Sequence, residues 1–226
     1  MSRLRSRKYW SETAGANGSL VWLGRGVGRW AVQKFLCNVP LDLTPQTEAR
    51  VKDHDPNQDD RSGPALTQGL LLTLLNMVVP DSYSEETVEA ISQVDSDRWY
   101  LGQAVETVFD EMERKAPGGA FRAGRAIYFM LPAQLKQVGI VDVTSFFEKL
   151  PGLWLMVTRG DTGVFRTQRL GEKLARVEMA QPYNCSFEEG ALVGFVEGLG
   201  HRAVVSRHLQ CMRDGRPFCL VEVGWD

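Results

Sequence analysis

Three cysteines and one histidine near the C-terminus are of the residue types that bind a metal ion. They are Cys185, His208, Cys211 and Cys219. Thiolate sulfur and imidazole nitrogen are the ligands of structural zinc sites, in which four protein ligands leave no position for a catalytic water. The sequence therefore predicts a structural zinc ion, bound by these four side chains, that joins a C-terminal hairpin to the segment carrying Cys185.

The spacing of Cys211 and Cys219 fits the two sides of a β-hairpin. Between them lies Asp214-Gly215, a dipeptide typical of hairpin turns. If the hairpin is centred on Gly215, the two cysteines lie opposite one another, with their Cβ atoms ~5 Å apart. Ordinary buried thiols, or a disulfide between Cys211 and Cys219, are the alternatives to a metal site.

His208 poses a geometric problem for this site. It precedes Cys211 by three residues, so a regular strand would direct the two side chains to opposite faces. Either a β-bulge or twist near Leu209 brings them together, or His208 is not the fourth ligand. The sequence leaves both possibilities open.

The elements that must position this cluster fall into two parts. Helical patterns dominate the first part, where Leu66–Val79 predicts a buried helix that ends at Pro80. The apolar residues Leu101, Val105, Val108 and Met112 have the spacing of an amphipathic helix. A short helix is expected to begin at residue 84. Two further helices are expected, one over residues 121–138 with a kink or boundary at Pro132, and one over residues 144–150.

Strand patterns dominate the second part. Ser186 and Glu189 have the spacing of a capping box, which predicts that one helix begins just after Cys185 and crosses the sheet. The strands are expected at Leu153–Thr158, Gly163–Gln168, Leu174–Met179, Arg202–Gln210 and Phe218–Val223.

Three glycines repeat every four residues along this crossing helix, at Gly190, Gly194 and Gly198. Glycine costs a helix ~1 kcal/mol relative to alanine, so a row of three indicates that the helix backbone packs very close to another element. We expect that element to be the sheet of the same domain.

The order of helices followed by strands predicts an α+β fold, with an N-terminal helical layer packed on an antiparallel sheet and one crossing helix. We expect an N-terminal extension and loop over residues 1–65, and one domain over residues 66–226. Within that domain, residues 66–150 form the helical part and residues 151–226 the zinc-binding α/β part. The loop Gly24-Arg-Gly26-Val-Gly28 lacks the third glycine of a dinucleotide-binding fingerprint, so we interpret it as a turn.

Charge and hydrophobicity argue against nucleic acid as a partner, against a membrane span and against secretion. The formal net charge of −2 argues against nucleic acid as the main partner. The most hydrophobic window is too short to span a bilayer, and the basic start of the chain is not followed by the apolar run of a secretory signal. Reduced cysteines with metal-ligand spacing suit a reducing compartment, so we expect a cytoplasmic protein.

Three C-terminal segments, Tyr183–Cys185, Phe187–Gly200 and Cys211–Trp225, resemble the 4-vinyl reductase domain family. This is a group of small-molecule-binding domains related to the sensor domains of aromatic-responsive regulators. In its metal-containing members zinc is held at the positions of Cys185, His208, Cys211 and Cys219, although the aromatic-sensing regulators usually have glutamate in place of His208. The resemblance implies the same α+β arrangement, with a ligand cavity between the helices and the sheet.

The resemblance implies a non-enzymatic, zinc-containing protein that binds a hydrophobic or aromatic small molecule, with a tetrapyrrole as one candidate. Such a protein would act as a carrier, a sensor or an accessory factor in assembly. One alternative is a reductase subunit acting on a vinyl tetrapyrrole, although no acid–base pair or nucleophile–base set stands out. The other is a dimeric assembly adaptor, a homodimer whose dimer face is the glycine row or the N-terminal extension. The aromatic residues expected to bind the ligand are Trp99, Phe129, Trp154, Phe165 and Tyr183.

Overall fold

The computed structural model describes residues 12–14, 20–22, 41–59 and 61–226. The chain divides into two compact units, residues 1–38 and 39–226. In the first unit the described residues form an antiparallel hairpin of β1 (Glu12–Ala14) and β2 (Leu20–Trp22). The glycine loop at residues 24–28 lies outside the described residues.

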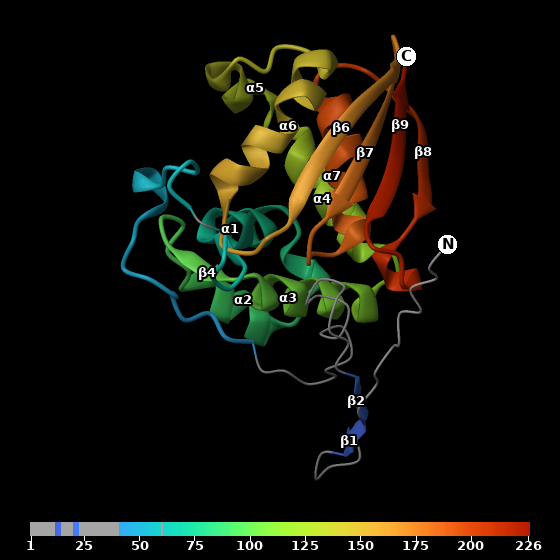
Figure 1. Cartoon of the computed structure of the whole chain (residues 1–226). Coiled ribbons are helices and arrows are strands. Elements are labelled where there is room, and N and C mark those ends of the chain that lie inside the picture. Colours follow the sequence, from blue (N-terminus) through green and yellow to red (C-terminus); the bar gives the residue numbers. More distant parts are fainter. Residues whose placement is uncertain (1–11, 15–19, 23–40, 60) are drawn as a thin grey trace, which may run out of the picture. The chain divides into compact units, whose positions relative to one another are not determined.

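The second unit contains a four-stranded antiparallel sheet and a smaller three-stranded one (Figure 1). The large sheet has the order β6-β7-β9-β8, and the small one has the order β4-β3-β5. The strands are β3 (Leu66–Gln68), β4 (Trp99–Leu101), β5 (Thr158–Arg159), β6 (Val164–Gly171), β7 (Leu174–Ala180), β8 (Ala203–Gln210) and β9 (Cys219–Trp225).

Seven α-helices accompany these strands in the described part of the second unit. They are α1 (Gly69–Val78), α2 (Glu85–Ser92), α3 (Gly102–Lys115), α4 (Gly119–Phe129), α5 (Pro132–Leu135), α6 (Val143–Val157) and α7 (Cys185–Gly198). Short 3₁₀ turns lie at η2 (Val51–Asp53), η3 (Pro80–Ser82), η4 (Lys136–Val138) and η5 (Met212–Asp214).

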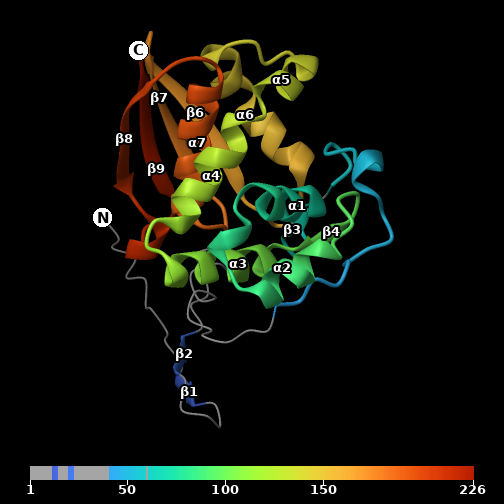
Figure 2. The same cartoon turned by 180° about the vertical axis from the view of Figure 1, so that it is seen from behind.

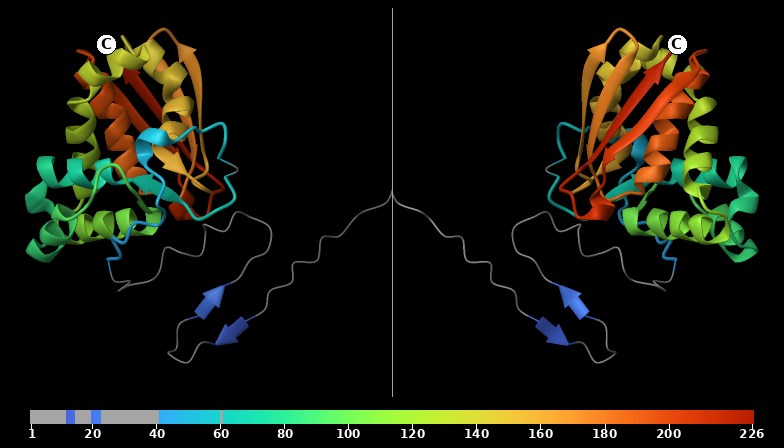
Figure 3. Two further views of the ribbon diagram at one scale, coloured as in Figure 1. Left: turned by 90° about the vertical axis from the view of Figure 1, so that its left-hand side faces the viewer. Right: turned by 90° about the vertical axis from the view of Figure 1, so that its right-hand side faces the viewer.

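Helix α7 lies between the four-stranded sheet and α4. Seen from behind, α4 and α7 stand in front of the strands (Figure 2), and the side views show α1–α3 gathered toward one end of the sheet (Figure 3). Alternate residues of β7, among them Val177 and Met179, are fully buried, as are Val221 and Val223 of β9. The expectation of an α+β fold, with helices on an antiparallel sheet and one crossing helix, is confirmed.

The glycine row of α7 packs on α4, so our expectation that it packs on the sheet was wrong. A Cβ atom added at Gly190, Gly194 or Gly198 would overlap the carbonyl oxygen of Phe121, Arg125 or Phe129, respectively. Because the row matches successive turns of α4, the two helix backbones approach far more closely than side chains of any size would permit. The row is covered by α4 and cannot supply a dimer face.

The predicted strand at Leu153–Thr158 was also wrong. Helix α6 continues through Pro151 to Val157, and only Thr158–Arg159 form a strand. Proline removes one backbone hydrogen bond from a helix, but the burial of Leu150 and Trp154 against the core keeps the helix intact on both sides of it.

Two helix starts also differ from the sequence prediction. The residues Leu66–Gln68 are a strand, and α1 begins only at Gly69. Helix α7 is capped by Asn184, whose side chain accepts hydrogen bonds from the backbone N–H groups of Ser186 and Phe187, and not by Ser186.

Residues 41–59, which belong to the second unit, form hydrogen bonds with its later residues. The backbone N–H of Gln46 donates to the carbonyl of Trp99 at 2.8 Å, and a ring nitrogen of His54 lies 3.1 Å from the carbonyl oxygen of Leu155. The domain boundary at residue 65 remains a prediction. No helix in the described ranges is long and apolar enough to cross a membrane.

Candidate functional site

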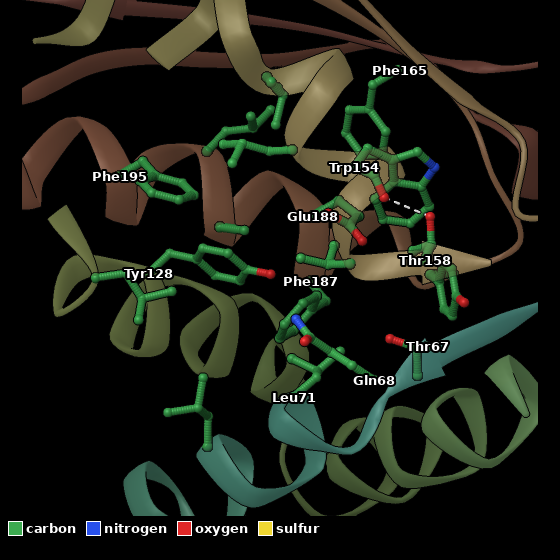
Figure 4. A pocket seen from close by; sticks show the side chains of 18 of the residues that line it. Thr67, Gln68, Leu71, Tyr128, Trp154, Thr158, Phe165, Phe187, Glu188 and Phe195 are labelled. Carbon is green, nitrogen blue, oxygen red and sulfur yellow. Dashed lines mark hydrogen bonds between the residues drawn. The ribbon is translucent and has the colours of Figure 1, made fainter. Parts of the chain in front are cut away.

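A cavity of about 160 Å³ lies between the helices and β3. Its wall is built mainly of apolar side chains from α1, α6 and α7, with Tyr128 from α4 and Phe165 from β6 (Figure 4). Aromatic rings dominate one side, where the ring centroids of Trp154 and Phe165 are 4.6 Å apart and those of Trp154 and Tyr183 are 5.4 Å apart. These rings from distant parts of the chain meet because α6 and the segment before α7 both turn toward β6.

Three of the five aromatic residues that we expected at the ligand site line this cavity, namely Trp154, Phe165 and Tyr183. The other two lie elsewhere. Trp99 is fully buried and meets the ring of His54 edge-on, with 5.0 Å between ring centroids. Phe129 is 53% exposed at the end of α4.

Sequence reasoning missed the polar side chains of the cavity. The carboxyl group of Glu188 lies among the rings (Figure 4), and its residue is only 9% exposed. Burial, and then the nearby charge of Glu106, raise the pKa of Glu188 to about 8. Burial and the Glu188 charge likewise raise the pKa of Tyr128, which also lines the cavity.

A signal for Glu188 was present in the sequence. Positions 188, 191, 192 and 195 have the i, i+3, i+4, i+7 spacing of one helix face, and the other three are Ala191, Leu192 and Phe195. All four line the cavity. A single acid on an otherwise apolar helix face is a recognisable candidate for a buried polar group.

The four predicted metal ligands form a second site, at the N-terminal end of α7. One ligand atom from each of Cys185, His208, Cys211 and Cys219 lies within 4.8 Å of all the others. A shift in the β8–β9 register between His208 and Gln210 forms the irregularity at Leu209 that this arrangement requires. The extra residue turns His208 to the side of the sheet on which the cysteines lie.

The three sulfur atoms lie within 3.8 Å of one another. The Sγ atom of Cys185 lies 3.1 Å from that of Cys219 and 3.4 Å from that of Cys211, and the last two are 3.8 Å apart. Metal–sulfur bonds of ~2.3 Å at tetrahedral angles separate sulfurs by ~3.8 Å. All three thiols are free of disulfides.

His208 has the orientation of a metal ligand. Its Nδ1 lies 3.2 Å from Oε2 of Glu189, a carboxylate that can only accept, so Nδ1 carries the proton and donates it. Its Nε2 atom is buried and has no hydrogen-bond partner in the described part of the chain. A histidine whose far nitrogen is held by a carboxylate presents a lone pair on the other nitrogen, as ligating histidines commonly do.

The surroundings of the cluster favour thiolate. Hydrogen bonding to Cys185 and to the backbone N–H of Met212 lowers the pKa of Cys219. Cys185 is the first residue of α7, where the helix dipole stabilises negative charge. The cluster can therefore hold a cation, and with four protein ligands it leaves no open coordination position.

Comparison with known proteins identifies the fold of the chain but assigns it to no family. No family model matches the chain, and no curated protein matches it. An H-NOX protein from S. oneidensis, solved in the Fe(II)NO ligation state, matches with a TM-score of 0.58 at 15% identity, over 71% of this chain and 99% of that one. An unliganded Fe(II) H-NOX protein from K. algicida matches with a TM-score of 0.52 at 7% identity, over 71% and 97%. The chain has the fold of H-NOX proteins.

These matches correct two of the expectations. The resemblance to the 4-vinyl reductase domain family is not borne out, because the similar solved structures are H-NOX proteins and no family model matches. The expectation of zinc as the cofactor is withdrawn as well, because these structures are described with iron, as Fe(II) or Fe(II)NO, and the convergence of four ligands does not identify an ion.

Haem, the cofactor that the H-NOX fold implies, does not fit the residues of this cavity. Haem iron needs an axial ligand, generally a histidine, a cysteine thiolate, a methionine or a tyrosinate. None of the side chains lining the cavity is a histidine, cysteine or methionine among the described residues. Burial raises the pKa of both Tyr128 and Tyr183, which disfavours tyrosinate. A volume of about 160 Å³ is also below the 300–1,000 Å³ that is usual for larger ligands.

Proposed function

We propose that the second unit is a non-enzymatic sensor domain whose cavity binds one small, largely apolar molecule about the size of an aromatic ring. The cavity itself carries this proposal: it has a volume of about 160 Å³ and a mainly apolar, aromatic-rich wall. An engineered apolar cavity of about 150 Å³ binds benzene, so the space here suits a single ring.

The fold supports the same proposal. The similar solved structures are described as H-NOX proteins in Fe(II)NO and Fe(II)CO ligation states, that is, with a small molecule bound. A tetrapyrrole, which we considered from the sequence, has no support from a cavity of this volume. The reductase alternative also lacks support, since the described cavity wall offers neither a nucleophile–base pair nor a nucleotide-binding loop.

Binding of toluene to the purified full chain tests this proposal. We expect saturable binding by titration calorimetry and a rise in melting temperature with toluene concentration, because a ligand of the native state alone stabilises it. The substitution Ala191→Leu adds volume to the cavity wall and should abolish binding, whereas Ala133→Leu, at an exposed position of α5, should not change it. If toluene binds both variants with equal affinity, it does not bind in this cavity, and the proposal is contradicted.

We infer a second role, the binding of one metal ion, for Cys185, His208, Cys211 and Cys219. The buried Nε2 of His208, which has no hydrogen-bond partner among the described residues, lies beside three thiols that form no disulfide, and this supports the role. The ion would be structural, because four protein ligands fill its coordination shell and the site joins the start of α7 to both ends of the β8–β9 connection.

Native mass spectrometry and elemental analysis of the full chain test the metal site. We expect a mass excess of one ion per chain, with elemental analysis identifying the element. Cobalt(II) added to the metal-free protein should give the intense absorption of a tetrahedral thiolate complex. If the chain has the mass of the bare polypeptide, and added cobalt(II) gives no thiolate absorption, the four side chains bind no metal ion.

A further inference from the structure

We propose that Glu188 is the recognition group of the cavity and that the ligand carries a basic nitrogen, protonated when bound, attached to its ring-sized apolar body. This inference rests on the proposed ligand-binding function and specifies the chemical class of the ligand. It starts from an acid that is placed inside an apolar wall.

The Glu188 carboxyl faces the cavity without a partner of its own. Figure 4 shows its oxygen atoms between the rings of the wall, and the residue is 91% removed from solvent, being 9% exposed. No group in the described ranges forms a hydrogen bond or an ion pair with this carboxyl. A buried carboxyl without a partner is strongly disfavoured if it is charged, and it still leaves a donor and acceptors unused if it is neutral.

Every titratable group that acts on this carboxyl is acidic or weakly acidic. Glu106 of α3 repels its charge, and Glu188 in turn acts on the hydroxyls of Tyr128 from α4 and Tyr183 from the segment before α7. Arg61 is a cation that influences Tyr183, the neighbour of this carboxyl. Its guanidinium is already bound to Asp59, Thr158 and Thr162.

The helix dipole does not supply the missing charge either. Glu188 lies in the first turn of α7, where backbone N–H groups carry partial positive charge. The side chain of Asn184 already accepts from two of these groups, and the N–H of Glu188 itself bonds the carbonyl of Asn184. A cationic ligand would therefore provide the counter-charge that the protein does not.

The rest of the wall suits such a cation. The rings of Tyr128, Phe187 and Trp154 surround the carboxyl (Figure 4). Ring faces attract a cation, and the attraction strengthens when water is excluded. A glutamine at position 188 would bind a neutral hydrogen-bonding ligand as well as a glutamate does, and it would avoid the free-energy cost of burying an ionisable group. The position of an acid here indicates a charged partner.

Three probes of one shape test this inference by titration calorimetry on the full chain at neutral pH: benzylamine, benzyl alcohol and toluene. We expect benzylamine to bind about tenfold or more tightly than the other two, as is typical of a hydrogen bond to a charged group. Glu188→Gln keeps the shape of the side chain and should remove that preference while leaving toluene affinity unchanged. Glu172→Gln removes the same charge at an exposed position and should leave the preference intact.

The outcomes separate this inference from the proposed function. Toluene that binds while benzylamine binds no more tightly would overturn the cationic ligand and leave the apolar cavity in place, as would a Glu188→Gln variant that kept the preference. Failure of all three probes to bind would overturn the ligand-binding function itself. If Glu188→Gln does not fold, the ranking of the three probes on the unmodified chain still decides the question.

Discussion

The carboxylate of Glu189 on α7 accepts a hydrogen bond of 3.2 Å from Nδ1 of His208 on β8, which leaves Nε2 of that ring directed away from Glu189 and without a partner among the described residues. The bond links the helix that carries Cys185 to the strand that leads to Cys211. It also raises the pKa of His208. Glu189 is therefore a positioning residue for the proposed metal site.

Glu189→Gln should weaken metal binding without removing a ligand. Loss of such an outer carboxylate typically lowers metal affinity ~10–100-fold. Competition with a coloured chelator measures the affinity, and the stoichiometry should remain one ion per chain. Glu197→Gln, an acid on the same helix that pairs with Arg125, is the matched control and should leave the affinity unchanged. Equal affinities for the two variants would contradict the role of Glu189.

Cys211→Ser should lose the ion and destabilise the C-terminal hairpin, because structural metal binding contributes to folding free energy. Cys211 is better suited to this test than the fully buried Cys219, where a serine hydroxyl would add its own cost. Chemical unfolding with and without a chelator separates the two effects. The chelator should destabilise the unmodified chain to about the level of the variant, and the variant itself should not respond.

Gly194→Ala should destabilise the protein by roughly 1–3 kcal/mol, the usual cost of inserting a methyl group into a packed interior. The added Cβ would overlap the backbone of Arg125, which belongs to a helix and cannot easily move. Gly152→Ala is the matched control, since Gly152 lies in α6 with open space around it. That variant should be stabilised by up to about 1 kcal/mol through helix propensity. Urea unfolding curves give both values, and two changes of the same sign would contradict the close approach of α4 and α7.

Glu188→Gln should change how stability depends on pH. The pKa of Glu188 is raised from its ordinary value of 4.5 to about 8 in the folded chain. Below pH 4.5 the side chain is protonated in both states, so it causes no penalty. As pH rises from 4.5 to 8 the unfolded chain ionises first, and the native state loses about 1.4 kcal/mol per pH unit relative to it.

The variant should therefore gain stability over the unmodified chain as pH rises through this window, and the difference should level off above pH 8. Denaturant unfolding at several pH values, without ligand, measures the difference. A constant difference from pH 5 to pH 8 would show that Glu188 is ionised in the folded chain at all of these values.

Local signals gave the fold class and most elements. The segment Ser84-Glu85-Glu86-Thr87 predicts a helix start, and Ser84 does cap α2 by accepting from the N–H of Thr87. The alternation of Leu174–Met179 predicts a strand with one buried face, which β7 has. Capping and periodicity depend on neighbours within a few residues, so they can be read without knowledge of the fold.

The failures occurred where distant contacts override local preference. The pattern of Leu153–Thr158 predicts a strand, but burial of Leu150 and Trp154 holds α6 together beyond Pro151. The glycine row indicates a close neighbour without saying which, and that neighbour is α4. The family resemblance drawn from the C-terminal cysteine pattern failed for a related reason, because a ligand set of four side chains can arise on many backbones.

The sequence by itself determined the residue types of the four-membered cluster and the α+β order of elements, because these depend on side-chain chemistry and on short spacings along the chain. It left open whether an irregularity near Leu209 brings His208 beside the cysteines, which the β8–β9 register decided. Only the tertiary structure decided that α7 packs on α4, that Trp154, Phe165 and Tyr183 share a cavity from which Trp99 and Phe129 are absent, and that Glu188 faces into it. A cavity forms between elements that are distant in the chain, and its volume and polarity depend on how their side chains pack. No pattern of neighbouring residues contains this information.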